Sequence, residues 1–389
     1  MFDTLPPVHQ DPLMHALEIV QRDTRPDKVD LGVGVYMDDC GRSRVLPSIK
    51  TAEAWLAANQ QSKGYLSSAG NPEFLSLIQP LLLGGSANLP VATVQTVGGS
   101  GALSVAGKLI ALSHPDATIW VPDPSWANHH PIMQGAGVKT TSYPYYDLTK
   151  HAIDFGAMLA ALDTAAPRDV VILHGCCHNP SGADLTIEQW GAVARALKRT
   201  GAVPLVDIAY QGFAHGLDED AAGMRLLLAE LPDVLVATSF SKNFGLYRDR
   251  IGALLLVSRT ADIETAWRHM LRIVRTSYSM PPDHGASVIA HILGTPALRA
   301  QWEVELADMR WRIGSMRRLL VDMLGKSSYG YIAEQKGMFS FLNINPEQVA
   351  TLREQHHIYA VGTGRINLAG LNHDNIERVA AAIREVTAA

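Results

Sequence analysis

From about residue 91 to residue 257, short apolar runs alternate with segments of helical periodicity. The apolar runs are typical of buried strands, and they comprise residues 118–121, 170–174, 203–207, 234–238 and 252–257. Residues 186–198 repeat apolar side chains at helical spacing, and Thr200 and Gly201 end that helix. Near-continuous apolar strands separated by helices indicate a mostly parallel sheet that is covered on both faces. The sequence therefore predicts a large α/β domain.

The pattern changes after Pro296. A long helix, two strand-like segments and a final helix are expected at residues 297–324, 338–342, 365–368 and 374–386. These elements predict a smaller α+β domain, and the N-terminal segment around residues 29–36 is expected to belong to it.

Three parts are therefore expected along the chain. Residues 1–40 form an N-terminal arm and the first part of the small domain, and residues 41–296 form the large domain. Residues 297–389 form the linking helix and the small C-terminal domain.

Bulk properties exclude several classes of protein. The chain has 389 residues, a formal net charge of -5 and scattered basic residues, so nothing favours nucleic-acid binding. No apolar stretch approaches the roughly 18 residues that a membrane span requires. Residues 1–7 lack the basic and apolar regions of a secretory signal.

The cysteines favour a reducing compartment. Cys40, Cys176 and Cys177 are an odd, low number with two neighbours in sequence, which makes a poor disulfide framework, and we expect a cytoplasmic protein. Two histidines, His174 and His178, flank the cysteine pair. Their spacing matches no standard zinc pattern, so we expect no metal site.

Polar side chains stand at four predicted strand ends. Asp123, Asn179, Asp207 and Ser239 each lie on the last position of an apolar run or a few residues beyond it. In open α/β sheets, ligands bind beyond the carboxyl ends of the strands. These four positions predict one shared site.

The segment from Ser239 to Gly245 carries the most distinctive chemistry. It reads Ser-Phe-Ser-Lys-Asn-Phe-Gly and follows a predicted strand. Lys242 can form a Schiff base with an aldehyde, and the hydroxyls of Ser239 and Ser241 can hold a phosphate. Arg250 is a second cation of the type that binds phosphate. The alternative is a solvated lysine in a polar loop.

A glycine-rich turn at residues 98–101 follows another strand-like segment and opens an apolar helix. The backbone N–H groups of Gly99 and Ser100 at a helix N-terminus favour a phosphate. A dinucleotide-binding fingerprint is the rival interpretation, but Leu103 and Ser104 stand where its third glycine is needed. A plain helix-start turn is the remaining alternative.

Other residues near the strand ends admit two interpretations each. Trp126 can be a packing residue or can stack on a planar ring. Asn179, before a proline, can mark a turn or donate a hydrogen bond to a ligand oxygen. His129 can be purely structural. A buried Asp207 needs a cationic partner, and a protonated pyridine nitrogen is one.

Together the motifs resemble those of the fold-type I pyridoxal-phosphate aminotransferases of subfamily Iα, which contains the aspartate and aromatic amino acid aminotransferases. The resemblance covers essentially the whole chain, with motifs in the family's order. They are 34–36, Tyr65, 99–101, Trp126, 174–182, 207–210, 239–242, Arg250, Arg275 and 364–365.

The resemblance implies a role for each residue around pyridoxal 5'-phosphate, which the large domain would bind. Lys242 forms the Schiff base and shuttles the proton, and Asp207 pairs with the pyridinium nitrogen. His129 supports Asp207, Tyr210 and Asn179 bind the ring oxygen, and Trp126 and Ala209 cover the two ring faces. The residues implied to hold the phosphate are Gly99, Ser100, Ser239, Ser241 and Arg250.

The resemblance also implies a substrate class. Arg365 is similar to the arginine that clamps the substrate α-carboxylate, and the backbone of Gly34 faces the substrate, beside Trp126 and Asn179. Arg275 is similar to the arginine that binds a distal carboxylate. Met280 stands where many aspartate enzymes carry asparagine, which could admit apolar or aromatic side chains. We expect ping-pong transamination of an acidic or aromatic amino acid with 2-oxoglutarate or oxaloacetate.

In the family, Tyr65 and Arg275 serve the neighbouring subunit, so a homodimer with shared sites is expected. Two other functions stay open at this point. One is a pyridoxal-phosphate lyase, decarboxylase or racemase on the same fold, and the other is a non-catalytic regulatory protein.

Overall fold

The computed structural model describes every residue except 1, 3, 5–11 and 389. We predicted that residues 1–7 form no secretory signal. Of these residues, only Phe2 and Thr4 are described, so the prediction falls largely outside the described residues. Among the described helices, none combines the length and apolar character needed to cross a membrane.

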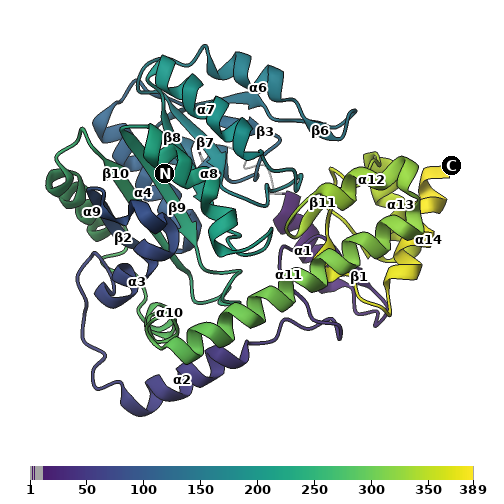
Figure 1. The fold of residues 1–389 in the computed structure, drawn as a ribbon. Coiled ribbons are helices and arrows are strands. Elements are labelled where there is room, and N and C mark those ends of the chain that lie inside the picture. Colours follow the sequence, from purple (N-terminus) through teal and green to yellow (C-terminus); the bar gives the residue numbers. More distant parts are fainter. Residues whose placement is uncertain (1, 3, 5–11, 389) are drawn as a thin grey trace.

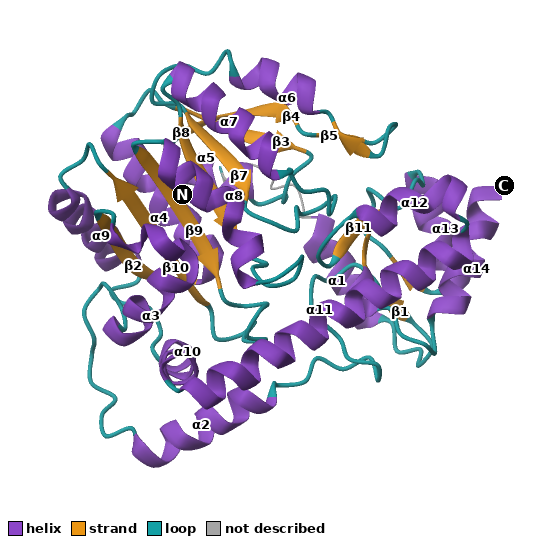
Figure 2. Cartoon of the chain, viewed as in Figure 1, coloured by secondary structure: helices purple, strands orange, loops and turns teal. Residues whose placement is uncertain are grey.

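The centre of the large domain is a seven-stranded sheet with the order β2-β10-β9-β8-β7-β3-β4. Its strands are β2 (Val91–Val97), β3 (Thr118–Asp123), β4 (Lys139–Pro144), β7 (Val170–His174), β8 (Val203–Ile208), β9 (Asp233–Ser239) and β10 (Ile251–Ser258). β10 pairs antiparallel with both of its neighbours, and the remaining pairs are parallel. The mostly parallel sheet and the five predicted strands are thus confirmed, and β4 is an additional edge strand (Figure 2).

Helices cover both faces of this sheet. Val170 and Ile172 of β7 belong to an apolar cluster with α4, α5 and α9, whereas Val171 and Leu173 belong to the cluster on the other face, with α6, α7 and α8. Alternation along a strand sends successive side chains to opposite faces. These helices are α4 (Gly98–Ser113), α5 (His129–Gly135), α6 (Phe155–Leu162), α7 (Ile187–Thr200), α8 (Leu217–Glu230) and α9 (Ile263–Ser277).

The helix predicted at residues 186–198 is α7, and its ends have clear chemical causes. Thr186 and Gln189 form a capping box, in which each side chain accepts a hydrogen bond from the backbone N–H of the other residue. Gly201 ends the helix in the left-handed conformation, with φ +76°.

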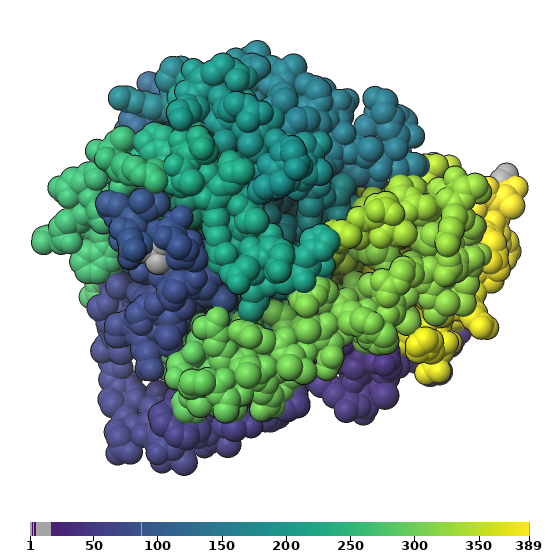
Figure 3. All heavy atoms as spheres, in the orientation of Figure 1, coloured from purple at the N-terminus to yellow at the C-terminus, as the bar shows by residue number. Residues whose placement is uncertain are grey.

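The C-terminal elements form the smaller part of the molecule, shown on the right in Figure 1. The long helix α11 (Pro296–Leu324) reaches it from the large part and lies along the lower surface in Figure 3. Two small sheets follow: β11 (Phe339–Phe341) with antiparallel β13 (Arg365–Asn367), and β1 (Val29–Asp30) with parallel β12 (Ile358–Tyr359). Through the pairing of β1 with β12, the segment around residue 29 contacts the C-terminal elements.

The remaining elements complete both parts. They are α1 (Pro12–Arg22), α2 (Pro47–Asn59), α3 (Pro72–Leu83), β5 (Tyr146–Asp147), β6 (Ala152–Ile153), α10 (His284–Gly294), α12 (Lys326–Glu334), α13 (Pro346–His356), α14 (Ile376–Ala388) and the 3₁₀ turns 84–88 and 368–370. The predicted long and final helices correspond to α11 and α14. The domain boundaries at residues 40 and 296 stay predictions.

Candidate active site

The polar strand ends surround one cavity of about 180 Å³. Most of its predicted site residues come from the ends of β8 and β9 and the start of α4. The predicted residues that line it are Gly99, Ser100, Trp126, Asn179, Asp207, Ala209, Tyr210, Ser239, Ser241, Lys242 and Arg250. His174, Cys176 and Tyr247 also line it, although none of the three was assigned to the site.

One end of the cavity gathers donors for an anion. Gly99 and Ser100 of the α4 N-terminus line this end, and the Ser239 hydroxyl donates to Ser241 Oγ at 3.1 Å. Arg250 donates to Ser241 Oγ at 3.3 Å and to the Tyr247 carbonyl at 3.0 Å. A Cβ on Gly98, which has φ +66°, would lie 2.5 Å from Arg250 Nη2. The missing side chain therefore makes room for the guanidinium beside the helix N-terminus.

Asp207 lies deeper in the cavity, at the end of β8, and a chain of polar groups supports it from behind. Its Oδ2 is 3.0 Å from His129 Nε2, and His129 Nδ1 is 2.7 Å from Ser125 Oγ. Ser125 Oγ is also 3.3 Å from His174 Nε2. The backbone N–H of Asn179 donates to His174 Nδ1 at 3.3 Å, which closes the chain.

Only one direction of donation satisfies this chain with neutral imidazoles. Because His174 accepts at Nδ1, its Nε2 donates to Ser125, the Ser125 hydroxyl donates to His129, and His129 donates to Asp207. Burial, followed by the nearby His129, lowers the pKa of His174 to about 3, so that ring is neutral. Burial, the largest single influence, works to raise the pKa of Asp207, but the hydrogen bond from His129 and the nearby charges, that of Lys242 among them, together outweigh it and the pKa is lowered. The carboxylate is therefore charged, and His129 holds it in place.

Lys242 follows β9 and faces this carboxylate across the cavity. Its Nζ lies 4.9 Å from the centroid of the Tyr210 ring. Burial lowers the pKa of Lys242 to about 8, while the charge of Asp207 acts in the opposite direction. An amine with this pKa exists partly in the neutral, nucleophilic form near neutral pH.

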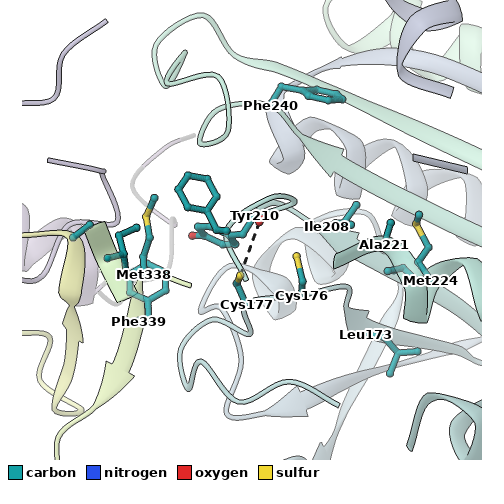
Figure 4. Packing of buried hydrophobic residues seen from close by; sticks show 14 of the residues in the cluster. Leu173, Cys176, Cys177, Ile208, Tyr210, Ala221, Met224, Phe240, Met338 and Phe339 are labelled. Carbon is teal, nitrogen blue, oxygen red and sulfur yellow. Dashed lines mark hydrogen bonds between the residues drawn. The ribbon is translucent and has the colours of Figure 1, made fainter. Parts of the chain in front are cut away.

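Tyr210 is held between the two parts of the molecule. Its ring meets Phe339 edge-on, with 5.9 Å between centroids, and Cys177 Sγ contacts its carbonyl oxygen at 3.9 Å (Figure 4). Burial raises the pKa of the Tyr210 hydroxyl well above its usual range, so it remains a hydrogen-bond donor.

Arg365 approaches from the small part. It is buried, donates to the Gly32 carbonyl at 2.6 Å and to Asn179 Oδ1 at 3.2 Å, and stacks over Phe339 at 4.4 Å. A Cβ on Gly34 would lie only 2.8 Å from Phe339, so glycine lets the N-terminal segment approach that ring. The structure thus brings Gly34, Asn179 and Arg365 together at one side of the site.

Tyr65 and Arg275 lie outside the cavity of this chain. The Tyr65 side chain is 96% exposed, and Arg275 is exposed near the end of α9, where it donates to Ser279 Oγ. The Ser68 hydroxyl donates to the Ser279 carbonyl at 2.8 Å, which joins the loop after Tyr65 to the loop before Met280. This bond connects the loop that carries Tyr65 to the segment that follows the last turn of α9, which carries Arg275.

Four residues that the sequence did not predict for the site contact residues that it did predict. They are Ser125, His174, Tyr247 and Phe339. Ser125 and His174 orient His129, Tyr247 supports Arg250 and accepts from the Tyr36 backbone N–H at 2.9 Å, and Phe339 lies under Arg365. His174 lies within the motif at residues 174–182 and Ser125 directly precedes Trp126, so both stand in or beside the motifs quoted above. Phe339 lies in a predicted strand, where an aromatic residue is expected for packing alone.

One group of side chains could be considered as a metal site, but its ligands are unsuitable. Cys176, Cys177 and Asp220 are buried, with ligand atoms within 4.8 Å of one another. Both oxygens of Asp220, however, already accept backbone N–H groups of the loop at residues 212–216. Burial contributes to raising the pKa values of both thiols, which disfavours the thiolate that metals require. The absence of a metal stays a prediction.

Known proteins resemble the chain over its full length. Residues 26–383 match the family aminotransferase class I and II. An aspartate aminotransferase of Escherichia coli is 45% identical, over 98% of this chain and 99% of the relative. An aromatic-amino-acid aminotransferase of Paracoccus denitrificans is 43% identical, over 99% and 100%.

Solved structures agree with these relatives. A crystal structure of an aromatic-amino-acid aminotransferase from Burkholderia pseudomallei, covalently bound to pyridoxal phosphate, has a TM-score of 0.95 and 40% identity, covering 99% of both chains. The cytoplasmic aspartate aminotransferase of Saccharomyces cerevisiae has a TM-score of 0.96 and 36% identity, covering 100% of this chain and 98% of that chain.

Proposed function

The chain belongs to the class I and II aminotransferase family and is a pyridoxal-phosphate-dependent aminotransferase, and from this premise we propose its substrates and the role of each site residue. The proposed reaction transfers the amino group of an acidic or aromatic L-amino acid to 2-oxoglutarate or oxaloacetate by a ping-pong mechanism. Relatives named for aspartate, aromatic amino acids and tyrosine support both substrate classes.

The cavity fits the cofactor at four places. The serine hydroxyls, the α4 N-terminus and Arg250 suit a phosphate, since they supply N–H and O–H donors around a cation. Asp207 is a buried carboxylate whose charge is maintained, which suits a protonated ring nitrogen. Lys242 offers an amine of lowered pKa to an aldehyde. Trp126 and Ala209, which both line the cavity, suit the two faces of a planar ring.

When bound, pyridoxal phosphate supplies an electron sink for the bonds at the substrate α-carbon. In the proposed mechanism, Lys242 removes a proton from that carbon and returns one to the cofactor side. Asp207 keeps the ring nitrogen protonated, and His129 keeps Asp207 oriented. Tyr210 and Asn179 donate hydrogen bonds to the ring oxygen, and the two serines and Arg250 fix the phosphate. Each of these contacts holds the reacting carbon near Lys242.

Arg365 is proposed to clamp the substrate α-carboxylate. Its guanidinium is presented in a fixed orientation by the Gly32 carbonyl and the Phe339 ring, so little side-chain freedom is lost when a carboxylate binds. Gly34 and Trp126 border the same space.

The observation that carries the proposal is the pair formed by Lys242, with its lowered pKa, and the charged Asp207 in one cavity. The test is a kinetic panel of amino donors with 2-oxoglutarate, together with spectra of the yellow holoenzyme. Aspartate, glutamate or an aromatic donor should change the cofactor absorbance and yield the matching 2-oxo acid. A Lys242→Ala protein should bind cofactor without turnover. Spectra unchanged by every donor, or alanine or ammonia formed without consumption of a keto acid, would contradict transamination.

We further propose a homodimer in which Tyr65 contacts the cofactor phosphate, and Arg275 the distal substrate carboxylate, of the other copy. Support comes from their exposure in a single chain and from the hydrogen bond between the loop after Tyr65 and the segment after α9. Sedimentation should give a dimer, and a fully active monomer would contradict this proposal. A cytoplasmic location is also proposed, supported by the three free cysteines among the described residues; cell fractionation tests it.

A further inference from the structure

A second cavity, of about 530 Å³, lies between helix α11 and two loops, residues 213–215 and 335–337. Its volume falls in the range of small-molecule sites. No residue assigned to the active site lines it. Figure 1 shows α11 crossing from the large part to the small part, and residues 213–215, which line the cavity, lead into α8.

The lining of this cavity is strongly cationic. Arg310, Arg317, Arg318 and Lys336 line it, and Asp308 is the one carboxylate among the lining residues. In the described part of the chain, none of the four cations forms an ion pair. Other cations of α11 do pair: Arg299 with Glu303, and Arg312 with Asp39. The excess charge is therefore local to the cavity.

The burial of Arg317 makes this excess of positive charge energetically unfavourable. Its side chain is 3% exposed and donates to the carbonyls of Ile332, Gly337 and Phe339 and to Ser340 Oγ. Those oxygens satisfy hydrogen bonds but carry no full negative charge. Burial lowers the pKa of Arg317 to about 9, so it remains charged at neutral pH. A buried cation without a countercharge is unfavourable, and an anion in the adjoining cavity would supply one.

The surface of α11 is shaped for an occupant. Arg310, Gly314, Arg317 and Arg318 recur at helical spacing and share one face. A Cβ at Gly314 would find its nearest neighbour, Arg318 Nη1, at 3.4 Å, so the centre of this face carries no side chain. Trp311, which is 70% exposed, stands at the border of the cavity.

We propose that this cavity binds a small multivalent anion, carrying phosphate or several carboxylates. Arg310, Arg318 and Lys336 contact the anion directly, and Arg317 provides the charge behind them. A small molecule is the proposed ligand, because the four cations line one cavity of about 530 Å³ instead of spreading over a surface.

The cavity is connected to the substrate clamp through the backbone. The N–H of Lys336 donates to the Gly182 carbonyl at 2.7 Å, which links the loop after α12 to the segment that carries Asn179. Arg317 donates to the Phe339 carbonyl at 3.2 Å, and Phe339 supports Arg365. An anion held by Arg318 and Lys336 would fix the loop at residues 335–337 against helix α11.

The test is calorimetric titration of the holoenzyme with pyrophosphate and, separately, with citrate. A saturating unreactive aromatic monocarboxylate is present, so that the substrate site is filled without a second multivalent anion. Binding of either probe supports the proposal, and the two arms distinguish a phosphate ligand from a polycarboxylate. Binding should weaken as ionic strength rises.

Variants locate the binding. Arg318→Gln and Lys336→Gln should each weaken it roughly tenfold, the effect expected for one charge-assisted contact. Arg299→Gln removes a cation of the same helix that lies outside the cavity, and it should leave affinity unchanged. Arg317 is not varied, because its bonds hold four acceptors of the fold. No binding of either probe, or an equal loss in Arg299→Gln, would overturn the assignment.

Discussion

In the protein without bound cofactor, the charged side chain of Lys242 is expected to lower the free energy of unfolding. Lowering its pKa from 10.5 to about 8 corresponds to about 3 kcal/mol of unfavourable charging in the folded state. This value is an upper limit, because the amine has some access to water through the cavity. Replacement by an uncharged side chain of similar length should remove the cost. We therefore expect Lys242→Met to raise the free energy of unfolding of cofactor-depleted protein by roughly 1 to 3 kcal/mol at pH 7.

The pH dependence gives the prediction its sign. Below pH 8 the lysine is protonated in both the folded and the unfolded state, so the full cost is present. Between pH 8 and 10.5 the unfolded chain binds more protons than the folded one, so wild-type stability rises with pH relative to the variant. The advantage of Lys242→Met should therefore shrink steadily over this range.

The assay is urea unfolding of cofactor-depleted wild type and variant at equal concentration, at pH 7, 8, 9 and 10. Lys198→Met serves as control, since Lys198 is 63% exposed in a surface ion pair with Glu230 and should change stability little at any pH. If Lys242→Met is no more stable than wild type at pH 7, or if its advantage does not change with pH, the inferred burial of the amine is wrong.

Three further substitutions test other parts of the site. His129→Leu removes a hydrogen bond that lowers the pKa of Asp207, so this pKa should rise. The acidic limb of the kcat/KM profile should then shift to higher pH, and an unchanged profile would exclude this role of His129. Arg365→Lys should raise KM roughly tenfold or more for every amino donor, because the paired contact with the α-carboxylate is lost, and a loss confined to dicarboxylates would speak against it. Gly98→Ala forces a Cβ to 2.5 Å from Arg250 Nη2 at a positive φ, so cofactor affinity measured by absorbance should drop by roughly tenfold, whereas unchanged affinity would separate Arg250 from the phosphate.

The sequence predicted the sheet well where strands are buried on both faces. Val170–His174 and its neighbours consist of near-continuous apolar residues, because helices cover them above and below. Lys139–Pro144 was missed because it is an edge strand, mostly exposed and rich in threonine and serine, and its pairing with β3 is the main sign of its structure. The antiparallel direction of β10 also leaves no trace in its composition, since periodicity reports burial and carries no strand direction.

The same physical limit applies to the site. Lys242, Asp207 and Arg250 could be predicted because each needs a partner that a strand end in an apolar environment does not supply. The order of hydrogen bonds from Asn179 to Asp207 could not, because it depends on distances between loops some fifty residues apart in sequence. Serine and histidine have many uses, so their presence in a motif does not reveal which atoms meet.

The proposed roles of Tyr65 and Arg275 cannot be derived from the structure of a single chain. A tyrosine that is 96% exposed gains nothing from its own fold, and Arg275, which contacts only a serine hydroxyl among the described residues, has no carboxylate to hold. A hydrogen bond from Ser68 joins the loop after Tyr65 to the segment that follows Arg275 and helix α9, so the two side chains are presented on connected surface segments. If that surface completes the cavity of a second copy, the distal side chain of the substrate meets Arg275 and the nearby Met280. Substrate choice is then a property of the assembled pair, whereas the chemistry around Lys242 is built within each chain.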